Sequence, residues 1–196
     1  MRLFGLEIPA KVIKSDAVLP VASSPINGDF LFQTLQSINT AGPKVTQKAF
    51  AILSRITRYN CLYAGSKLVA LSEELAFLED YVNLVKLGMP ETLVVFFVKP
   101  DDVGPEVIPP MVVLPFIENA FKYGVKKDEF SIIYILIAKV DKMLKLEVKY
   151  SFLDKAALDF TGIRKQLELR YPSKYKLSFR EDTGENQFIV HLNLYL

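Results

Sequence analysis

The stretch VIPPMVVLPFIENAFKYG, residues 107–124, lies within the part of the chain beyond Pro90, where the hydrophobic period shortens to that of strands. Prolines interrupt its apolar run, and the residues that follow Pro115 have helical spacing as far as Gly124. We therefore predict a proline-punctuated entry into a helix that ends near Gly124.

In the segments on either side of this helix, the spacing of apolar residues is typical of β-strands. The expected strands are TLVVFFV (92–98), FSIIYILIAKV (130–140), MLKLEVKY (143–150), YKLSFRE (175–181) and QFIVHLNLYL (187–196). The second and third form a hairpin around 140–142, and the last two form a hairpin around DTGEN. Between the hairpins, TGIRKQLELRYP (161–172) predicts a short helix closed by Pro172. The chain beyond Pro90 thus predicts about five strands and two helices.

Three further helices are expected upstream. Apolar residues recur at helical spacing over 26–38, a second helix covers roughly 44–62, and a third covers 72–87. Ser72 is the expected N-cap of the third helix, and Glu73 and Glu74 fall where the helix dipole favours anions. Residues 1–25 show no sustained period and predict an extended arm or linker that could hold one short strand. The fold class is therefore α+β.

Composition excludes several classes of function. The 196 residues include 24 basic and 22 acidic side chains with no concentrated basic stretch, so we expect no nucleic acid partner. The single cysteine, Cys61, excludes an intrachain disulfide and fits a reducing cytoplasm. The longest apolar runs have strand length, so we expect no membrane segment and a cytoplasmic location, which includes the cytoplasmic part of a membrane-bound sensor.

Several segments together resemble the LytS/YehU-type sensor histidine kinases. They are INGDFLFQTLQSI (26–38), LSRITRYN (53–60), LSEELAFLEDYVNLVKL (71–87), IPPMVVLPFIENAFKYG (108–124) and IRKQLELRYP (163–172), in order and at the family's spacing. The resemblance implies an arm (1–25), a helical dimerisation and phosphoacceptor-like region (26–90) and an ATPase-like domain (91–196). That last domain is expected to be a GHKL (Bergerat) α/β sandwich, with a mixed sheet of about five strands and helices on one face.

The resemblance implies a phosphoaccepting histidine, but Asp29 stands at that position. The single histidine, His191, falls in the last strand, where alternation sets it opposite Val190 and Leu192. Asp29 could accept phosphate as an acyl phosphate, although no second acid lies within a helical turn of it. The more ordinary interpretation is a helix N-terminal carboxylate favoured by the dipole.

The nucleotide-binding residues that the resemblance implies are only partly retained. ENAFKYG keeps Glu118, Asn119 and Lys122, of which Asn119 would hold Mg²⁺ and Lys122 would face phosphates. The alternative is that these are ordinary polar residues on a helix that meets no nucleotide. Where the family has Asp-Asn-Gly to read adenine, this chain has Tyr150-Ser151-Phe152, and AALDF lacks the glycines of the family's lid.

We therefore interpret the chain as a catalytically degenerate histidine kinase-family protein, a dimerising or regulatory module of two-component signalling that needs no cofactor. Its expected partners are a second copy, a response regulator or an active histidine kinase. The alternative is a divergent kinase or ATPase that binds Mg-ATP through Asn119. A phosphotransfer protein is a third hypothesis, and the absence of a suitable histidine argues against it.

The dimer is predicted from an apolar stripe on the upstream helices. Its residues are Phe30, Leu31, Leu35, Ile38, Ile52, Ile56 and Tyr59. The alternative is that this stripe packs against the α/β layer within one chain.

Overall fold

The structure is a computed structural model. It describes residues 2–3, 6–7, 32, 35–36, 38, 42–63, 65–126, 128–151, 160–182 and 184–196. The position that corresponds to the family's phosphoacceptor, Asp29, lies outside these residues, as do the first four residues of AALDF (156–160), the stretch that stands in place of the family's lid.

A five-stranded mixed sheet forms one layer of the molecule, in the spatial order β4-β6-β7-β9-β8. Its strands are β4 (Leu93–Val98), β6 (Ser131–Val140), β7 (Met143–Ser151), β8 (Tyr175–Asp182) and β9 (Gln187–Tyr195). β4 runs parallel to β6, and every other neighbouring pair is antiparallel. The predicted sheet and both hairpins are confirmed. Asp141 supplies the left-handed turn residue of the first hairpin, with a φ of 53°.

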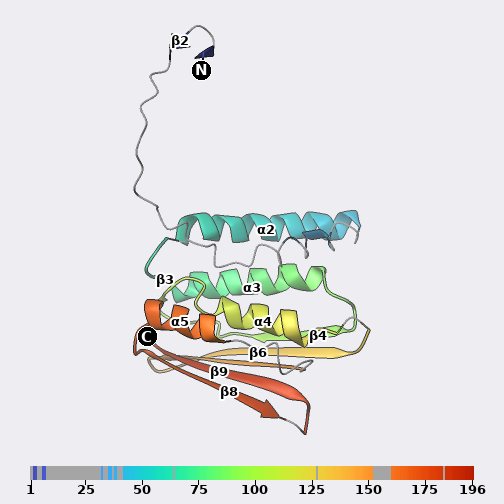
Figure 1. Ribbon diagram of the computed structural model, residues 1–196, viewed down its shortest axis with the longest axis vertical. Coiled ribbons are helices and arrows are strands. Elements are labelled where there is room, and N and C mark those ends of the chain that lie inside the picture. The colour runs from blue at the N-terminus through green and yellow to red at the C-terminus, as the bar shows by residue number, and fades with distance from the viewer. Residues whose placement is uncertain are drawn as a thin grey trace.

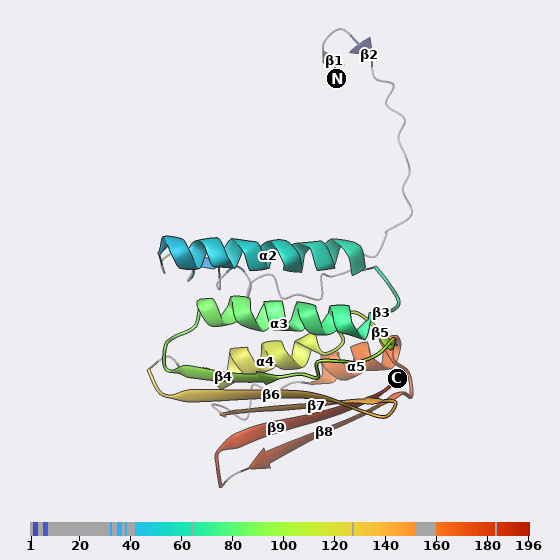
Figure 2. The same cartoon turned by 180° about the vertical axis from the view of Figure 1, so that it is seen from behind.

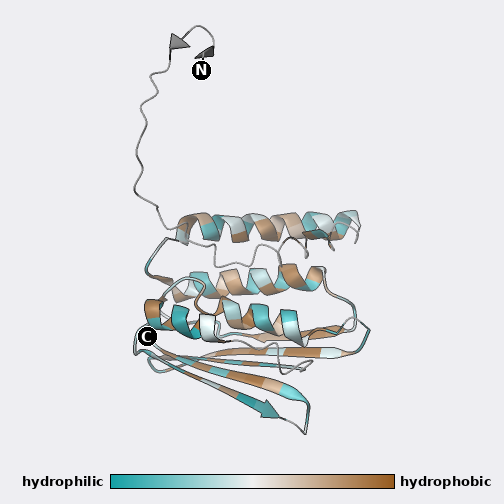
Figure 3. Ribbon diagram, in the orientation of Figure 1, coloured by the Kyte–Doolittle hydropathy of each residue, from teal (hydrophilic) through white to brown (hydrophobic). Residues whose placement is uncertain are grey.

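The described helices all lie on one side of this sheet. α4 (Leu114–Gly124) and α5 (Thr161–Arg170) lie nearest to it, α3 (Leu71–Leu87) lies over them, and α2 (Pro43–Tyr63) lies over α3 (Figures 1 and 2). Figure 3 shows hydrophilic and hydrophobic residues alternating along α2, as expected for a helix with one buried face. The prediction of an α+β fold with helices on one face is therefore confirmed.

Short strands complete the described elements. β1 (Arg2–Leu3) pairs with β2 (Leu6–Glu7), and β3 (Val69–Ala70) pairs with β5 (Val107–Ile108), both antiparallel. The second pair joins the start of α3 to the segment that enters α4. Two-residue strands carry no readable period, so neither pair could be predicted from spacing.

The prediction of Ser72 as the N-cap of α3 is wrong. The helix begins one residue earlier, at Leu71, and its N-cap is Ala70, which makes no side-chain capping bond. The Leu71 N–H instead donates to the carbonyl oxygen of Glu106 at 2.8 Å. A neighbouring strand segment therefore satisfies a backbone donor that a serine side chain would otherwise have capped.

One hydrophobic core contains residues from both sides of Pro90. α3 is buried along most of its length, because its residues contact α2 on one side and the elements near the sheet on the other. Ile38, Ile52, Ile56 and Tyr59 are buried in this core. Their burial within one chain removes them as an argument for a dimer, since they already have partners.

Candidate functional site

The outer face of α4 carries the three residues implied for Mg-nucleotide binding. Glu118, Asn119 and Lys122 recur at helical spacing, with Glu118 and Asn119 half-buried and Lys122 exposed. The opposite face is buried and contacts β6 and β7. α4 therefore brings the three predicted side chains onto one side, directed away from the sheet.

Glu118 is already engaged by a neighbouring helix. Its Oε1 accepts a hydrogen bond from the hydroxyl of Tyr81 on α3 at 2.9 Å. Burial, and then the Glu118 carboxylate, raise the pKa of Tyr81, so the phenol keeps its proton and remains a donor. Lys122 extends over the neighbouring Tyr123 ring, with Nζ 5.0 Å from the ring centroid.

Tyr150, at the position where the family resemblance implies an adenine-binding aspartate, is buried at the end of β7. The residue is 1% exposed, and its hydroxyl has no hydrogen-bond partner. Burial raises the pKa of Tyr150, so the group is neutral at physiological pH. Its phenol can only donate or weakly accept, and it lacks the negative charge of a carboxylate.

An aromatic cluster packs against Tyr150. The Phe188 ring lies 5.6 Å from that of Tyr150, and Phe160 stacks on Phe179 and Phe188 at centroid distances of 4.1 Å and 5.6 Å. The Arg164 guanidinium carbon of α5 lies 5.1 Å from the Phe179 ring centroid. Aromatic packing of this kind ties the start of α5 to β8 and β9.

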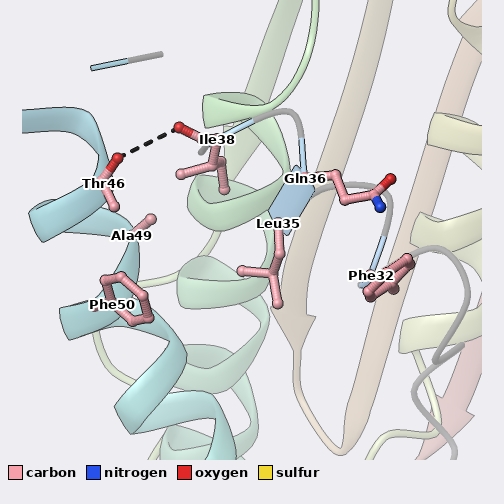
Figure 4. Close-up of a pocket in the computed structure, with 7 residues that line it drawn as sticks. All are labelled: Phe32, Leu35, Gln36, Ile38, Thr46, Ala49 and Phe50. Carbon is pink, nitrogen blue, oxygen red and sulfur yellow. Dashed lines mark hydrogen bonds between the residues drawn. The ribbon is translucent and has the colours of Figure 1, made fainter. Parts of the chain in front are cut away.

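Two cavities lie beside α2. One, of about 300 Å³, is lined by Phe32, Leu35, Gln36, Ile38, Thr46, Ala49 and Phe50 (Figure 4). In it, the Thr46 hydroxyl donates to the Ile38 carbonyl oxygen at 3.4 Å. A second cavity, of about 270 Å³, lies between α2 and α3 beside Arg55 and Arg58, where Asp80 accepts bidentate bonds from Arg55 at 2.7 and 2.6 Å.

His191 lies on the sheet face that points away from the helices. Its Nε2 contacts Glu147 Oε2 at 2.8 Å across the β7–β9 pair, and Lys149 contacts the other carboxylate oxygen at 2.8 Å. Partial burial acts to raise the pKa of Glu147, but the bonds from Lys149 and His191 hold it below its usual value. The prediction that His191 is a strand residue opposite Val190 and Leu192 is confirmed, since both of these are buried.

Sequence reasoning missed the role of Glu74, which we assigned to a favourable helix-dipole position. Glu74 is fully buried and contacts Tyr59 of α2 and the backbone of Met111. A signal was present in the spacing, because Glu74 shares a helix face with Leu71, Leu75 and Leu78.

Comparison with known proteins matches this chain to one family. The sequence model of the family "Histidine kinase" matches residues 18–93. The sensor protein kinase HptS of Staphylococcus aureus (strain USA300) is 34% identical over 98 residues, which are 48% of this chain and 19% of that protein. An uncharacterised sensor-like histidine kinase of Staphylococcus epidermidis gives the same identity and coverage. The matched region thus spans about a fifth of the length of these relatives.

Solved structures share the fold. The histidine kinase domain of a blue-light activated histidine kinase from Erythrobacter litoralis superposes with a TM-score of 0.50 and 11% identity, over 86% of this chain and 95% of that one. Full-length ShkA, in complex with AMPPNP, gives a TM-score of 0.50 and 9% identity over 85% of this chain and 42% of that one.

The fold is similar to that of the histidine kinase domain from Erythrobacter litoralis. Part of this chain is therefore similar in sequence to histidine kinases, over residues 18–93 in the family model and over 98 residues in the staphylococcal relatives. None of the helices within the described ranges combines the length and hydrophobicity needed to cross a bilayer.

Proposed function

We propose that this chain is a catalytically degenerate histidine kinase-family protein that acts as a regulatory interaction module in bacterial two-component signalling. One observation carries the proposal. The sequence contains a single histidine, His191, which lies in β9, while Asp29 stands at the acceptor position of the family. Autophosphorylation needs a histidine nucleophile in the dimerisation region, and the sequence has none there.

The surroundings of Tyr150 support the loss of nucleotide binding. A base-binding site needs an acceptor for the exocyclic amine of adenine and an open space for the ring. Here the residue in that position is a buried neutral phenol packed against Phe188. Deleting a hydrogen-bonding partner from such a site costs on the order of 10⁴-fold in discrimination. The residues around Tyr150 therefore do not fit adenine, and we derive no phosphoryl transfer through this site.

A divergent ATPase remains the second candidate function, favoured by the retained face of α4. Asn119 offers an amide oxygen suited to Mg²⁺, and Glu118 lies on the same face. The hydrogen bond from Tyr81 already occupies one oxygen of Glu118. Under this reading, nucleotide would be held mainly through its metal and phosphates.

A homodimer is the assembly we propose, from apolar side chains that the chain leaves exposed. Phe32, Phe50 and Leu62 are 61%, 65% and 57% exposed. Phe32 and Phe50 also line the cavity shown in Figure 4, so burial against a second copy would cover both of these exposed rings. A response regulator or an active histidine kinase is the further partner we propose, with a cytoplasmic site of action.

Titration of the purified chain with Mg-ATP tests the proposal. We expect no change in melting temperature up to millimolar nucleotide, because a ligand that does not bind the folded state cannot stabilise it. The matched variants are Asn119→Ala, at the metal position, and Asn83→Ala, at an exposed asparagine of α3. A rise of several degrees that Asn119→Ala abolishes and Asn83→Ala keeps would establish the ATPase reading instead. Light scattering on the same samples tests the dimer, which a monomer would contradict.

A further inference from the structure

Glu74 is the one acidic side chain that is fully buried among the described residues. Its Oε2 accepts a hydrogen bond from the Tyr59 hydroxyl and another from the Met111 backbone N–H, the latter at 2.8 Å. Its Oε1 is buried without a partner. A carboxyl in this position has one fully engaged oxygen and one free to carry a proton.

The contacts of Glu74 join three parts of the fold. Tyr59 belongs to α2, Glu74 to α3, and Met111 to the segment that leads into α4. α2 lies on the far side of α3 from α4 (Figures 1 and 2), so the bonds of Glu74 connect two elements that α3 separates. Movement of α2 along α3 would therefore act directly on a residue held by the entry to α4.

Met111, at one end of this connection, has an unusual backbone conformation. Its φ is 58°, in the left-handed region that a residue with a side chain seldom adopts, and it is buried. Such a backbone conformation persists only where its surroundings hold it. The bond from its N–H to Glu74 is one of the contacts that do so.

The charged and titratable groups around Glu74 are few. α2 presents Tyr59 and Tyr63, α3 presents Glu73, and α5 presents Arg170, whose charge reaches Glu74. The segment 109–113 contributes backbone alone. Burial raises the pKa of Glu74 to about 7, and the bonds from Met111 and Tyr59, with the charge of Arg170, offset only part of that rise.

We propose that the Glu74 carboxyl is a proton-controlled junction between α2 and the entry to α4. When it is ionised, Tyr59 and the Met111 N–H donate charge-assisted hydrogen bonds to one oxygen, and the three elements are held together firmly. When Oε1 takes a proton, both bonds become neutral ones of roughly half the strength, and the coupling of α2 to Met111 loosens. This junction operates whether or not the chain binds nucleotide.

The Met111 amide is the direct reporter of this junction. We expect its proton chemical shift, followed by ¹⁵N-resolved NMR on the full chain from about pH 5 to about pH 9, to titrate with a midpoint near neutrality. Glu74→Gln should make the shift independent of pH. Glu73→Gln removes the exposed acid one residue earlier in α3 and should leave the titration unchanged.

Two further variants test the network without altering the carboxyl. Tyr59→Phe removes a donor that favours the ionised form, and Arg170→Gln removes a favourable positive charge, so each should raise the midpoint. Tyr63→Phe, a neighbouring ring whose centroid lies 5.0 Å from that of Tyr59, should leave it in place. A Met111 amide that does not titrate, or a midpoint unmoved by Tyr59→Phe and Arg170→Gln, would overturn the proposal. These two variants keep it testable even if Glu74→Gln does not fold.

Discussion

Gly124 and Tyr150 approach so closely that a β-carbon added at Gly124 would lie 2.7 Å from the Cβ of Tyr150. Contacts of this length are not tolerated, and the nearest atom belongs to the first carbon of the tyrosine side chain, which can move only with its backbone. The end of α4 can therefore lie this close to β7 only because Gly124 has no side chain. This same contact sets the distance between the helix that carries Asn119 and the strand that carries Tyr150.

Gly124→Ala should therefore destabilise the fold. We expect a loss of about 1–3 kcal/mol in the free energy of unfolding, because the added methyl group forces α4 away from β7. Urea denaturation measures the effect. Gly162→Ala is the matched control, since nothing lies within 4 Å of a β-carbon at that helical position. It should be neutral or raise stability by up to about 1 kcal/mol. Equal effects of the two variants would contradict the close approach.

The buried hydroxyl of Tyr150 gives a second prediction. Because it has no partner, Tyr150→Phe removes an unsatisfied polar atom, and stability should stay unchanged or rise by about 1 kcal/mol. Tyr171→Phe provides the contrast, because the Tyr171 hydroxyl donates to the Tyr195 carbonyl oxygen at 2.6 Å. That variant should lose about 1 kcal/mol in the same urea experiment. A clear loss of stability in Tyr150→Phe would mean that the hydroxyl is bonded in solution.

Much of this fold could be predicted from the local spacing of apolar residues in the sequence. The strands and hairpins of the sheet follow from alternation, and the bounds of α2 and α4 follow from helical spacing together with Pro115 and Gly124. The start of α3 could not be predicted, because the bond from Leu71 to Glu106 that replaces a cap joins residues far apart in the sequence. Tertiary pairing of this kind overrides a local capping signal.

The candidate site was predictable in part for the same reason. Helical spacing alone sets Glu118, Asn119 and Lys122 on one face of α4. Their neighbours follow only from the packing of distant elements, as with the bond from Tyr81 to Glu118 and the stacking of Phe160 on Phe179. Whether these residues bind nucleotide stays a prediction. The burial of Glu74 was missed because its position in the first turn of α3 was attributed to the helix dipole, although it shares a helix face with Leu71 and Leu78.

Burial of Glu74 makes stability depend on pH. Its pKa is raised in the folded state from 4.5 to about 7, so the folded chain binds more protons than the unfolded chain between these values. Stability is therefore highest below about pH 4.5 for this group and falls as pH rises through about 7. The fall occurs although ionisation strengthens the bonds from Tyr59 and Met111, because the cost of burying the charge exceeds the gain from those bonds. The total loss is on the order of 3 kcal/mol. Glu74→Gln should flatten this part of the curve, measured by urea denaturation across the same pH window, whereas Glu73→Gln should retain the fall. A wild-type chain that gains stability as pH rises across that window would contradict the raised pKa of Glu74.

Substitution of Asp29 by histidine tests the proposal that this chain is catalytically degenerate. If only the phosphoaccepting histidine had been lost, Asp29→His would regain autophosphorylation. We expect instead that this variant takes up no labelled phosphate from Mg-ATP, because the buried phenol of Tyr150 and the rings around it leave no acceptor for adenine. The measurement is acid-labile, alkali-stable label on the protein, the signature of a phosphohistidine. The opposite outcome is that label appears in Asp29→His and disappears in the Asp29→His, Asn119→Ala double variant. That result would show that nucleotide binds through α4 and that only the phosphoaccepting histidine was lost.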